Sequence, residues 1–317
     1  MDQLIAALKA AGEPTRLRIL ALLDHGELTV TELTEILGQS QPRVSRHLRL
    51  LCEAGLLDRF REGTWMFYRL ADGGNDDTAL ARRIVSLISK GDRAIAADAK
   101  ALEAVRERRA AAAAQYFRRN AADWNRLRSL YVPEQEVEAA LLDVVGDRPI
   151  GDLLDVGTGT GRMLEIFAAR AERALGIDLS RDMLAVARAN IEQKALHNCQ
   201  VRQGDMYRLG LDGESVDVAL FHQVLHFAED PQAAIAECAR VLRPGGLVVI
   251  ADFAPHDVEF LREQHAHRRL GFAADEVAGW CRSAGLIPGP VRHLEGKDKQ
   301  LTVTVWSATK PGQGARV

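Results

Sequence analysis

Three glycines at alternate positions restrict the fold of this chain more than any other feature of its sequence. Residues 153–167 read Leu-Leu-Asp-Val-Gly-Thr-Gly-Thr-Gly-Arg-Met-Leu-Glu-Ile-Phe, so an apolar run ends at Asp155, the glycines follow, and a helical pattern begins at once. Glycine lets the backbone turn tightly and lets a ligand approach main-chain N–H groups, and the helix that follows presents the positive end of its dipole. The pattern predicts a strand, a ligand-binding loop and a helix. A dinucleotide fingerprint would require a glycine where Arg162 stands.

A mostly parallel α/β sheet is the expected fold of residues 132–317. Beyond Pro133 short apolar segments alternate with helical patterns, as in a parallel sheet covered on both faces. Strands are expected at 153–156, 173–177, 199–203, 216–221 and 247–251, with an antiparallel pair at 291–294 and 301–307. Such sheets bind ligands beyond the carboxyl ends of their strands. Asp155, Asp178 and Asp205 follow three of those ends, and Asp178 can accept two hydrogen bonds from a ribose diol.

This ordered set resembles the class I S-adenosylmethionine (SAM) dependent methyltransferases over residues 112–310. The resemblance implies a Rossmann-like, seven-stranded fold that binds SAM and forms S-adenosylhomocysteine (SAH). It implies that the glycine loop wraps the methionine moiety, that Asp205 accepts the adenine amino group, and that His222 and Gln223 line the methyl-donor end. The expected cofactor-binding residues are Asp155, Gly157, Gly159, Gly161, Asp178, Leu179, Met183, Asp205, Met206, His222 and Gln223.

Catalytic and acceptor-binding residues are expected after the fourth and fifth strands. The sulfonium of SAM carries the reactivity, so the protein mainly aligns a nucleophile with the methyl group. His222 and His226 are candidate general bases, and Asp252 is a third candidate. In the insert after the fifth strand, the candidate ligands of an anionic or metalloid small-molecule acceptor are His256, His267 and Arg268. His265 and Arg269 could bind the same acceptor, but a solvated helix face explains these two residues equally well.

Residues 1–97 are predicted to form a winged helix-turn-helix domain that also dimerises. An apolar helix that includes Leu17 is followed by a second helix, which Thr29 or Thr31 can cap. A third helix starts after Ser40. Alternating apolar residues on both sides of Glu62-Gly63 then predict a β-hairpin, the wing.

The outer face of the third helix is basic. Arg43, Arg46 and Arg49 lie about one helical turn apart and can contact phosphates or guanine edges. Arg59, Arg61 and Arg69 on the wing can contact backbone phosphates. The expected DNA-binding residues are Gln41, Arg43, Ser45, Arg46, His47, Arg49, Arg59 and Arg61. The alternative is a solvated basic face that contacts protein.

These motifs resemble the ArsR-type family of bacterial regulators, on the segments 13–20 (Glu-Pro-Thr-Arg-Leu-Arg-Ile-Leu), 45–48 (Ser-Arg-His-Leu) and 53–57 (Glu-Ala-Gly-Leu-Leu). The resemblance implies double-stranded operator DNA as a partner. A homodimer is expected, because one recognition helix reads too few base pairs for useful specificity. Its apolar faces would be those of Leu4 and Leu8 and of Leu80, Ile84, Leu87 and Ile88.

No metal site is expected in this domain, and here the sequence departs from the metal sensors of that family. Residues 27–32, where arsenic sensors place a cysteine pair, read Glu-Leu-Thr-Val-Thr-Glu. The helix expected at 79–99, where relatives place metal ligands between subunits, contains no histidine.

Residues 98–131 are expected to connect the domains as a long helix. The segment is rich in alanine, arginine and glutamate and has neither proline nor glycine. Its second half is similar to the N-terminal cap of small-molecule methyltransferases, so that Tyr116, Trp124 or Tyr131 could cover the cofactor. Core packing is the alternative role for these aromatic residues.

Composition fits a two-domain cytoplasmic protein. At 317 residues the chain is long for one domain, and its net charge of −3 requires any basic surface to be local. There is no basic-then-apolar leader and no run of about 20 apolar residues, so no membrane is expected. The four cysteines (Cys52, Cys199, Cys238 and Cys281) stand far apart, which indicates reduced buried thiols and argues against a thiolate cluster that could hold arsenic.

Two functions are compatible with these features. In the first, a SAM-dependent methyltransferase with a small-molecule acceptor is fused to a transcriptional regulator. In the second, the methyltransferase-like domain only senses SAM or SAH and does not catalyse. The donor-end residues His222 and Gln223 and the full-length substrate insert favour the enzyme.

Overall fold

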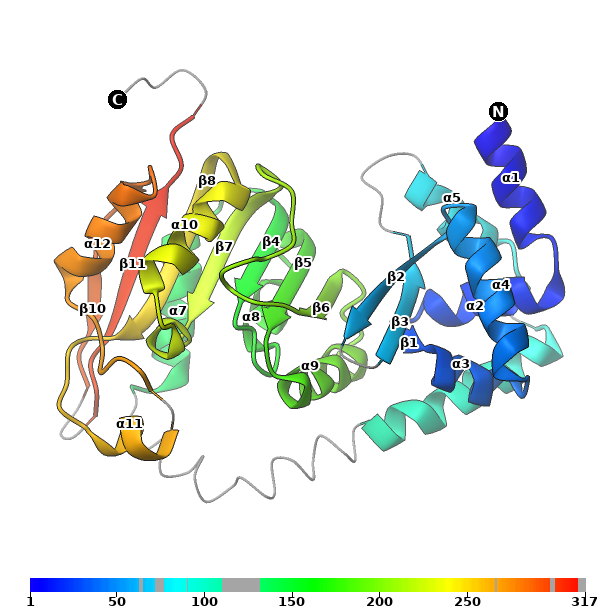
Figure 1. Cartoon of the computed structure of the whole chain (residues 1–317), viewed down its shortest axis with the longest axis horizontal. Helices are drawn as coiled ribbons and strands as arrows, with labels where there is room; N and C mark the ends of the chain where they lie inside the picture. The colour runs from blue at the N-terminus through cyan, green and yellow to red at the C-terminus, as the bar shows by residue number, and fades with distance from the viewer. Residues whose placement is uncertain are drawn as a thin grey trace. The chain divides into compact units, whose positions relative to one another are not determined.

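The structure, a computed structural model, describes residues 1–62, 65–71, 77–89, 91–109, 132–265, 267–296 and 300–312. The chain divides into two compact units, Met1–Ala111 and Ala112–Val317 (Figure 1).

The first unit is a helical domain with a small antiparallel sheet. Its helices are α1 (Asp2–Ala11), α2 (Pro14–Leu23), α3 (Val30–Leu37), α4 (Gln41–Glu53) and α5 (Asp77–Ser86), and its strands are β1 (Leu28–Thr29), β2 (Leu57–Glu62) and β3 (Trp65–Leu70). The strand order is β1-β3-β2, so β2 and β3 form the expected hairpin. Thr29 rather than Thr31 caps α3, in a capping box with Glu32.

The helix predicted at 79–99 is interrupted, which corrects the sequence-based expectation. Helix α5 ends at Ser86, and a separate helix occupies 93–109. Asp92 starts the second helix, because its Oδ1 accepts hydrogen bonds from the backbone N–H groups of Ala94 (2.7 Å) and Ile95 (3.2 Å). Residues 98–109 of the predicted connector therefore continue a helix that begins at residue 93, and the rest of the connector, with Tyr116, Trp124 and Tyr131, lies outside the described residues.

Helix 93–109 belongs to the core of the first unit. Leu102 and Val105 are buried in the same apolar cluster as the helix-turn-helix core. Arg109 donates to both carboxylate oxygens of Glu32 at 2.9 Å. Arg18 and Asp98 form a second bidentate pair. Charge-assisted hydrogen bonds of this kind fix the helix against α2 and α3.

The second unit is built on a mainly parallel sheet with the order β10-β11-β8-β7-β4-β5-β6, and β9 pairs with β11. Its strands are β4 (Ile150–Val156), β5 (Ala171–Asp178), β6 (Cys199–Gln203), β7 (Val216–His222), β8 (Leu242–Phe253), β9 (Ile287–Pro288), β10 (Arg292–Leu294) and β11 (Val303–Thr309). Strand β11 runs antiparallel to both β8 and β10. The expected strands are therefore present, and the seven-stranded path is that of the predicted fold, with the short β9 as an addition.

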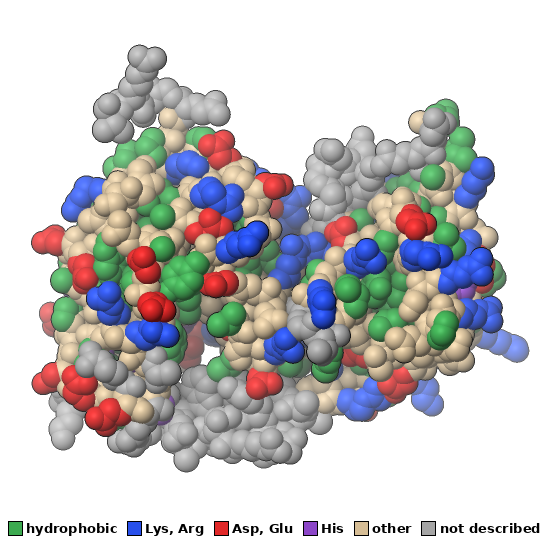
Figure 2. Space-filling model, in the orientation of Figure 1, with side chains coloured by type: hydrophobic (Ala, Val, Ile, Leu, Met, Phe, Trp, Pro, Cys, Tyr) green, Lys and Arg blue, Asp and Glu red, His purple; other side chains and the backbone are tan. Residues whose placement is uncertain are grey.

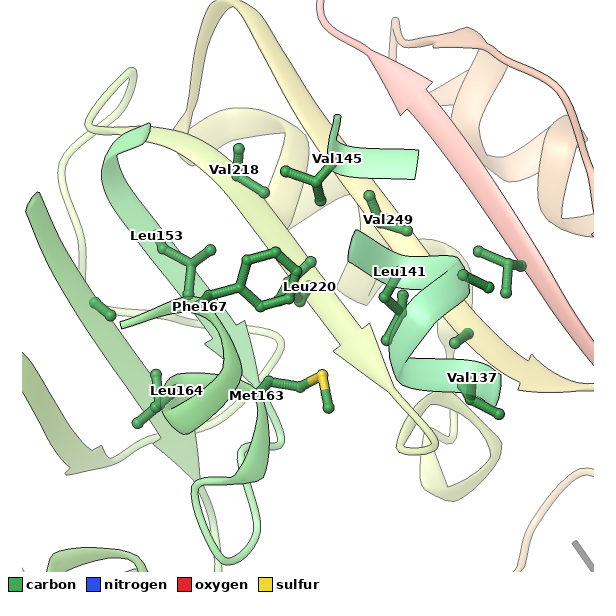
Figure 3. Packing of buried hydrophobic residues seen from close by; sticks show 14 of the residues in the cluster. Val137, Leu141, Val145, Leu153, Met163, Leu164, Phe167, Val218, Leu220 and Val249 are labelled. Atoms are coloured by element: carbon green, nitrogen blue, oxygen red, sulfur yellow. The ribbon is translucent and has the colours of Figure 1, made fainter. Parts of the chain in front are cut away.

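Helices cover both faces of this sheet. They are α7 (Glu134–Val145), α8 (Arg162–Phe167), α9 (Arg181–Gln193), the 3-10 turn η1 (Leu225–Phe227), α10 (Pro231–Val241), α11 (Phe260–His265) and α12 (Ala274–Ser283). Side chains alternate across the strands, so Leu153 belongs to one apolar cluster and Leu154 to the other. Figure 3 shows the first cluster, in which Phe167 of α8 and Leu141 of α7 pack on β4, β7 and β8.

Charges of both signs are mixed on the face of the molecule that Figure 2 shows. Lys and Arg side chains are interspersed with Asp and Glu over the visible face in Figure 2, in keeping with the net charge of −3. None of the helices in the described ranges combines the length and apolarity that a bilayer crossing requires.

Candidate functional site

A cavity of about 800 Å³ opens at the carboxyl ends of β4, β5, β6 and β7. Ten of the eleven expected cofactor-binding residues line it: Asp155, Gly157, Gly159, Asp178, Leu179, Met183, Asp205, Met206, His222 and Gln223. The exception, Gly161, is the N-cap of α8 with a φ of 82°. The carboxyl ends of parallel strands meet at one edge of a sheet, and this brings the three predicted acids together.

The glycine loop is shaped by close contacts that a side chain would prevent. Gly157 has a φ of 71°, and a Cβ on it would lie 2.1 Å from a Cγ atom of Val224. Its backbone N–H donates to the carbonyl of Ile177 at 2.7 Å, which ties the loop to the end of β5. The loop therefore keeps a cradle that only glycine permits at this position.

Asp155 is the most unusual acid in the cavity. Its carboxylate is buried, Oδ2 accepts from Thr158 Oγ1 at 2.6 Å, and Oδ1 has no hydrogen-bond partner among the described residues. Burial, opposed by the Thr158 hydrogen bond and assisted by the charge of Asp178, raises the pKa of Asp155 to about 7. A buried acceptor without a donor suits a ligand that brings a cationic N–H, such as the α-ammonium of a methionine moiety. Thr158 was not among the expected site residues, although it lies between two of the glycines.

Asp178 is held in place by backbone donors. Its Oδ2 accepts from the N–H of Gly159 and its Oδ1 from that of Ser180, both at 2.8 Å. Each oxygen keeps a second lone pair, so the carboxylate can still accept from a diol. Asp205, whose Oδ1 accepts from Tyr207 N at 3.0 Å, stands beside Met206 on the same cavity wall. The residues present therefore fit the amino-acid, ribose and base portions of SAM or SAH.

The part of the cavity that His222 and Gln223 line combines a buried imidazole with strained backbone. His222 Nε2 is buried and has no hydrogen-bond partner in the described part of the chain. Burial lowers the pKa of His222 to about 4. Gln223 has a φ of 51°, a left-handed conformation that non-glycine residues rarely adopt. Its N–H donates to the carbonyl of Ala251 at 2.7 Å, which stabilises this geometry.

His226, which also lines the cavity, forms a dyad with Asp252. His226 Nδ1 lies 2.8 Å from Asp252 Oδ1, and both side chains are buried. His267 stacks on His226 with ring centroids 4.0 Å apart. Phe227 packs on both imidazoles, and His226, His267 and Phe227 line the cavity. Asp252 is thus a buried partner of His226, and Phe227 is a cavity residue that sequence reasoning missed.

The expected acceptor-binding residues fall in different places. His267 and Arg268 line the cavity, and so does His265, which sequence reasoning left undecided. His256 does not line the cavity, and its Nδ1 accepts from the N–H of Val258 at 3.2 Å. Its expected role as an acceptor ligand therefore has no support from its position.

Arg162, which interrupts the dinucleotide spacing, is held at the cavity by two acids. Its guanidinium donates to Glu138 at 2.6 and 2.9 Å and to Glu165 at 2.9 Å. The hydrogen bonds that Arg162 donates to Glu138 and Glu165 raise the pKa of its guanidinium. The side chain helps to fix α7 against the start of α8.

No metal site is formed in the part of the chain that the structure describes: no group of three His, Cys, Asp or Glu side chains is placed to hold a metal ion. Cys199, Cys238 and Cys281 are buried free thiols, whereas Cys52 is only half-buried.

In the first unit, α4 presents its basic face to solvent. Arg43, Arg46 and Arg49 are exposed, as are Arg59 and Arg61 of β2. Arg46, Arg49 and Arg59 line a hollow of about 370 Å³ between α4 and the wing.

Two basic residues expected on this surface lie elsewhere. His47 is half-buried and 3.6 Å from Glu13 Oε2, because it faces the start of α2. Burial lowers its pKa. Arg69 is buried in the hairpin and pairs with Asp58 at 3.3 Å. Neither is available to a phosphate in this arrangement.

Both units match known families. Residues 154–250 match the family described as methyltransferase domain, and residues 13–59 match that described as bacterial regulatory protein, arsR family. The chain is 37% identical over 118 residues to an uncharacterized 37.1 kDa protein in transposon Tn4556 of Streptomyces fradiae, covering 36% of this chain and 34% of that protein. It is 31% identical over 150 residues to the malonyl-[acyl-carrier protein] O-methyltransferase of Serratia marcescens, covering 47% and 56%. It thus spans about half the length of these relatives, or less.

Among solved structures, the YcgJ protein of Bacillus subtilis matches 56% of this chain and 99% of its own, with a TM-score of 0.51 and 18% identity. At this identity the match shows the fold alone.

Proposed function

We propose a double function for this chain, which joins an ArsR-family helix-turn-helix domain at residues 13–59 to a class I methyltransferase domain at residues 154–250. The first unit binds operator DNA as a homodimer. The second transfers a methyl group from SAM to a small-molecule acceptor.

One observation carries the enzymatic half of the proposal: Asp155, Asp178 and Asp205 converge on one cavity at the strand ends. Asp155 Oδ1 is available to the ammonium of the donor, Asp178 to its ribose, and Asp205 with Met206 to its adenine. SAM, when bound, supplies an electrophilic methyl group on a sulfonium. The chain supplies alignment, with His222 and His226 as the candidate groups for proton removal at the donor end.

The DNA half of the proposal rests on the exposed arginines of α4 and β2. Arg43, Arg46 and Arg49 are spaced to follow one groove, and Arg59 and Arg61 are placed to contact the backbone. Exposed apolar residues on α1, among them Leu4 and Leu8, supply a surface for the dimer. In this view Arg46→Ala weakens operator binding, whereas Arg82→Ala, an exposed arginine of α5, serves as the matched control.

The sensor is the second candidate, and helix 93–109 is the feature that favours it. That helix is bonded to the helix-turn-helix through Arg109 and Glu32, so a change transmitted to it would act on α3. Operator affinity measured with and without saturating SAH at fixed salt separates the candidates. An unchanged affinity excludes the sensor.

The enzyme is tested by methyl transfer. The full chain is incubated with methyl-labelled SAM and fractionated small molecules from a bacterial extract, and label is sought in an organic-soluble product. We expect transfer by the wild type and loss of transfer in Asp178→Ala. Binding of SAM without transfer to any fraction contradicts the enzyme and leaves the sensor.

A further inference from the structure

We propose that His226 is the catalytic base, that Asp252 is its positioning residue, and that the acceptor is an aromatic molecule which is methylated on a hydroxyl group. This inference rests on the proposed methyltransferase function and names its substrate class. It is carried by the geometry of the dyad and by the aromatic wall around it.

The dyad is held rigidly. Asp252 is fully buried in β8, and its carboxylate accepts three hydrogen bonds: from His226 Nδ1 (2.8 Å), from the backbone N–H of His226 (3.1 Å) and from that of Phe253 (2.8 Å). Since Asp252 occupies Nδ1, Nε2 is the nitrogen left to meet a substrate. A carboxylate at Nδ1 fixes the tautomer with its proton on that nitrogen and stabilises the imidazolium that forms when Nε2 takes up a proton.

The loop after α11 completes the site. The backbone N–H groups of Arg268 and Arg269 donate to the carbonyl of His226 at 3.0 and 3.1 Å, and His267 N donates to the carbonyl of Leu261. These bonds hold His267 against His226. Two neighbouring segments, η1 and the loop, therefore form one wall of the cavity.

The composition of this wall selects the acceptor. The imidazole rings of His226 and His267 are stacked, and Phe227 lies edge-on to His267 at 5.2 Å. Burial, together with the neighbouring His226, lowers the pKa of His267 to about 3, so that this ring is uncharged near neutral pH. Flat, uncharged rings favour an aromatic partner. Arg268 and Glu229 also line the cavity, and they pair with each other at 3.7 Å.

The presence of a base at this wall indicates a hydroxyl. A carboxylate acceptor is already ionised at neutral pH, so it requires no base. A thiol has a pKa of about 8.5 and reacts through the fraction that is already thiolate, so it does not require a buried base either. A phenolic hydroxyl has a pKa near 10 and is a weak nucleophile until its proton is removed. In the transfer the hydroxyl oxygen forms a bond to the methyl carbon, the carbon–sulfur bond breaks with its electron pair on sulfur, and the hydroxyl proton moves to Nε2 of His226. The products are a methyl ether, SAH and an imidazolium, which returns its proton to water.

His222 shares the cavity but is a poorer base. Burial lowers its pKa to about 4, and its unpartnered Nε2 lacks the carboxylate that orients His226. We therefore place His222 beside the donor and assign proton removal to His226.

The first experiment measures binding and does not need turnover. The full chain saturated with SAH is titrated with one- and two-ring hydroxylated aromatics and, for each, the matched amino compound. We expect the hydroxylated compounds to bind the wild type. They should bind His226→Gln and Asp252→Asn at least about fivefold more weakly than the wild type, while the affinity for SAH stays unchanged. Failure of all the hydroxylated probes to bind, or a consistent preference for the amino compounds, overturns the acceptor class.

The second experiment measures methyl transfer to the hydroxyl probe that binds best. We expect kcat to fall about 100-fold or more in His226→Gln, and to fall in Asp252→Asn with a displaced pH profile. His222→Gln should lower kcat less than His226→Gln does. His197→Gln, an exposed histidine remote from the cavity lining, is the matched control and should retain wild-type kcat.

The outcomes separate this inference from the proposed function. If the wild type transfers methyl groups to hydroxylated aromatics and His226→Gln keeps kcat within threefold, the base is wrong and the enzyme stands. If SAH does not bind to the wild type, the proposed function fails first. If hydroxylated probes bind beside SAH and are not methylated, the catalytic assignment of His226 is overturned.

Discussion

Asp155→Asn is expected to gain stability relative to the wild type as the pH rises. The stability is the free energy of unfolding of the second unit. The pKa of the buried carboxyl is raised from its ordinary 3.8 to about 7. Because the folded pKa lies above the unfolded one, the contribution of this group to stability is fully present below pH 3.8 and is lost as the pH rises through 7. A shift of about three pKa units corresponds to roughly 4 kcal/mol. The asparagine, which does not ionise, has no such dependence.

The difference between the two proteins isolates this effect from every other titrating group. Urea unfolding is followed by tryptophan fluorescence at several pH values between 4 and 8, because Trp306 of the second unit is 2% exposed whereas Trp65 of the first is 63% exposed. The free energy of unfolding of the variant minus that of the wild type should rise by up to about 4 kcal/mol across this range. Asp212→Asn, at an exposed loop position, should give a flat difference. A difference for Asp155→Asn that is equally flat would refute the buried, partly unpaired carboxylate.

Three further predictions follow from individual contacts. Gly157→Ala should lower the stability of the second unit by about 2 kcal/mol or more in urea unfolding, because its φ is 71° and the loop leaves no room for a Cβ; a loss well below this would contradict the tight loop. Arg46→Ala should weaken operator binding by about 1–3 kcal/mol in fluorescence anisotropy at fixed salt, and an unaltered affinity would mean that α4 is not the recognition helix. Arg109→Ala should destabilise the first unit by about 1.5–3 kcal/mol, because it removes charge-assisted bonds to the partly buried Glu32. Both variants are compared by thermal unfolding. Arg108 pairs with Glu35 and both side chains are more than half exposed, so Arg108→Ala should change the thermal midpoint little. Equal effects of the two variants would contradict the role of burial.

That the three acids lie at one cavity could be predicted from the sequence, because one rule of topology governs their position. Asp155, Asp178 and Asp205 each follow a strand, and parallel strands end at one edge of the sheet, so short local patterns determine a shared location. The sequence offers Thr29 or Thr31 as the cap of α3, and the local capping box with Glu32, three residues away, selects Thr29.

The acceptor side could not be predicted in this way. The dyad of His226 and Asp252 joins η1 to β8 across 26 residues, and its geometry depends on how both pack on the sheet. The position of His267 depends on a loop that folds back onto η1. His47 was assigned to the outer face of α4 by its charge, but packing against Glu13 turns it inward. Side-chain type thus indicated the chemistry of these residues, and tertiary contacts decided which of them reach the cavity.

Calorimetric titration of the full chain with SAH tests whether the cavity of the second unit binds the cofactor. We expect a single site with micromolar affinity, a binding free energy of about −7 to −8 kcal/mol. Binding should be at least about tenfold weaker in Asp178→Ala, because the Asp178 carboxylate is expected to hold the ribose. The absence of heat and of any thermal stabilisation of the wild type, with both SAH and SAM, would contradict the assignment of the cavity and with it both proposed roles of the second unit.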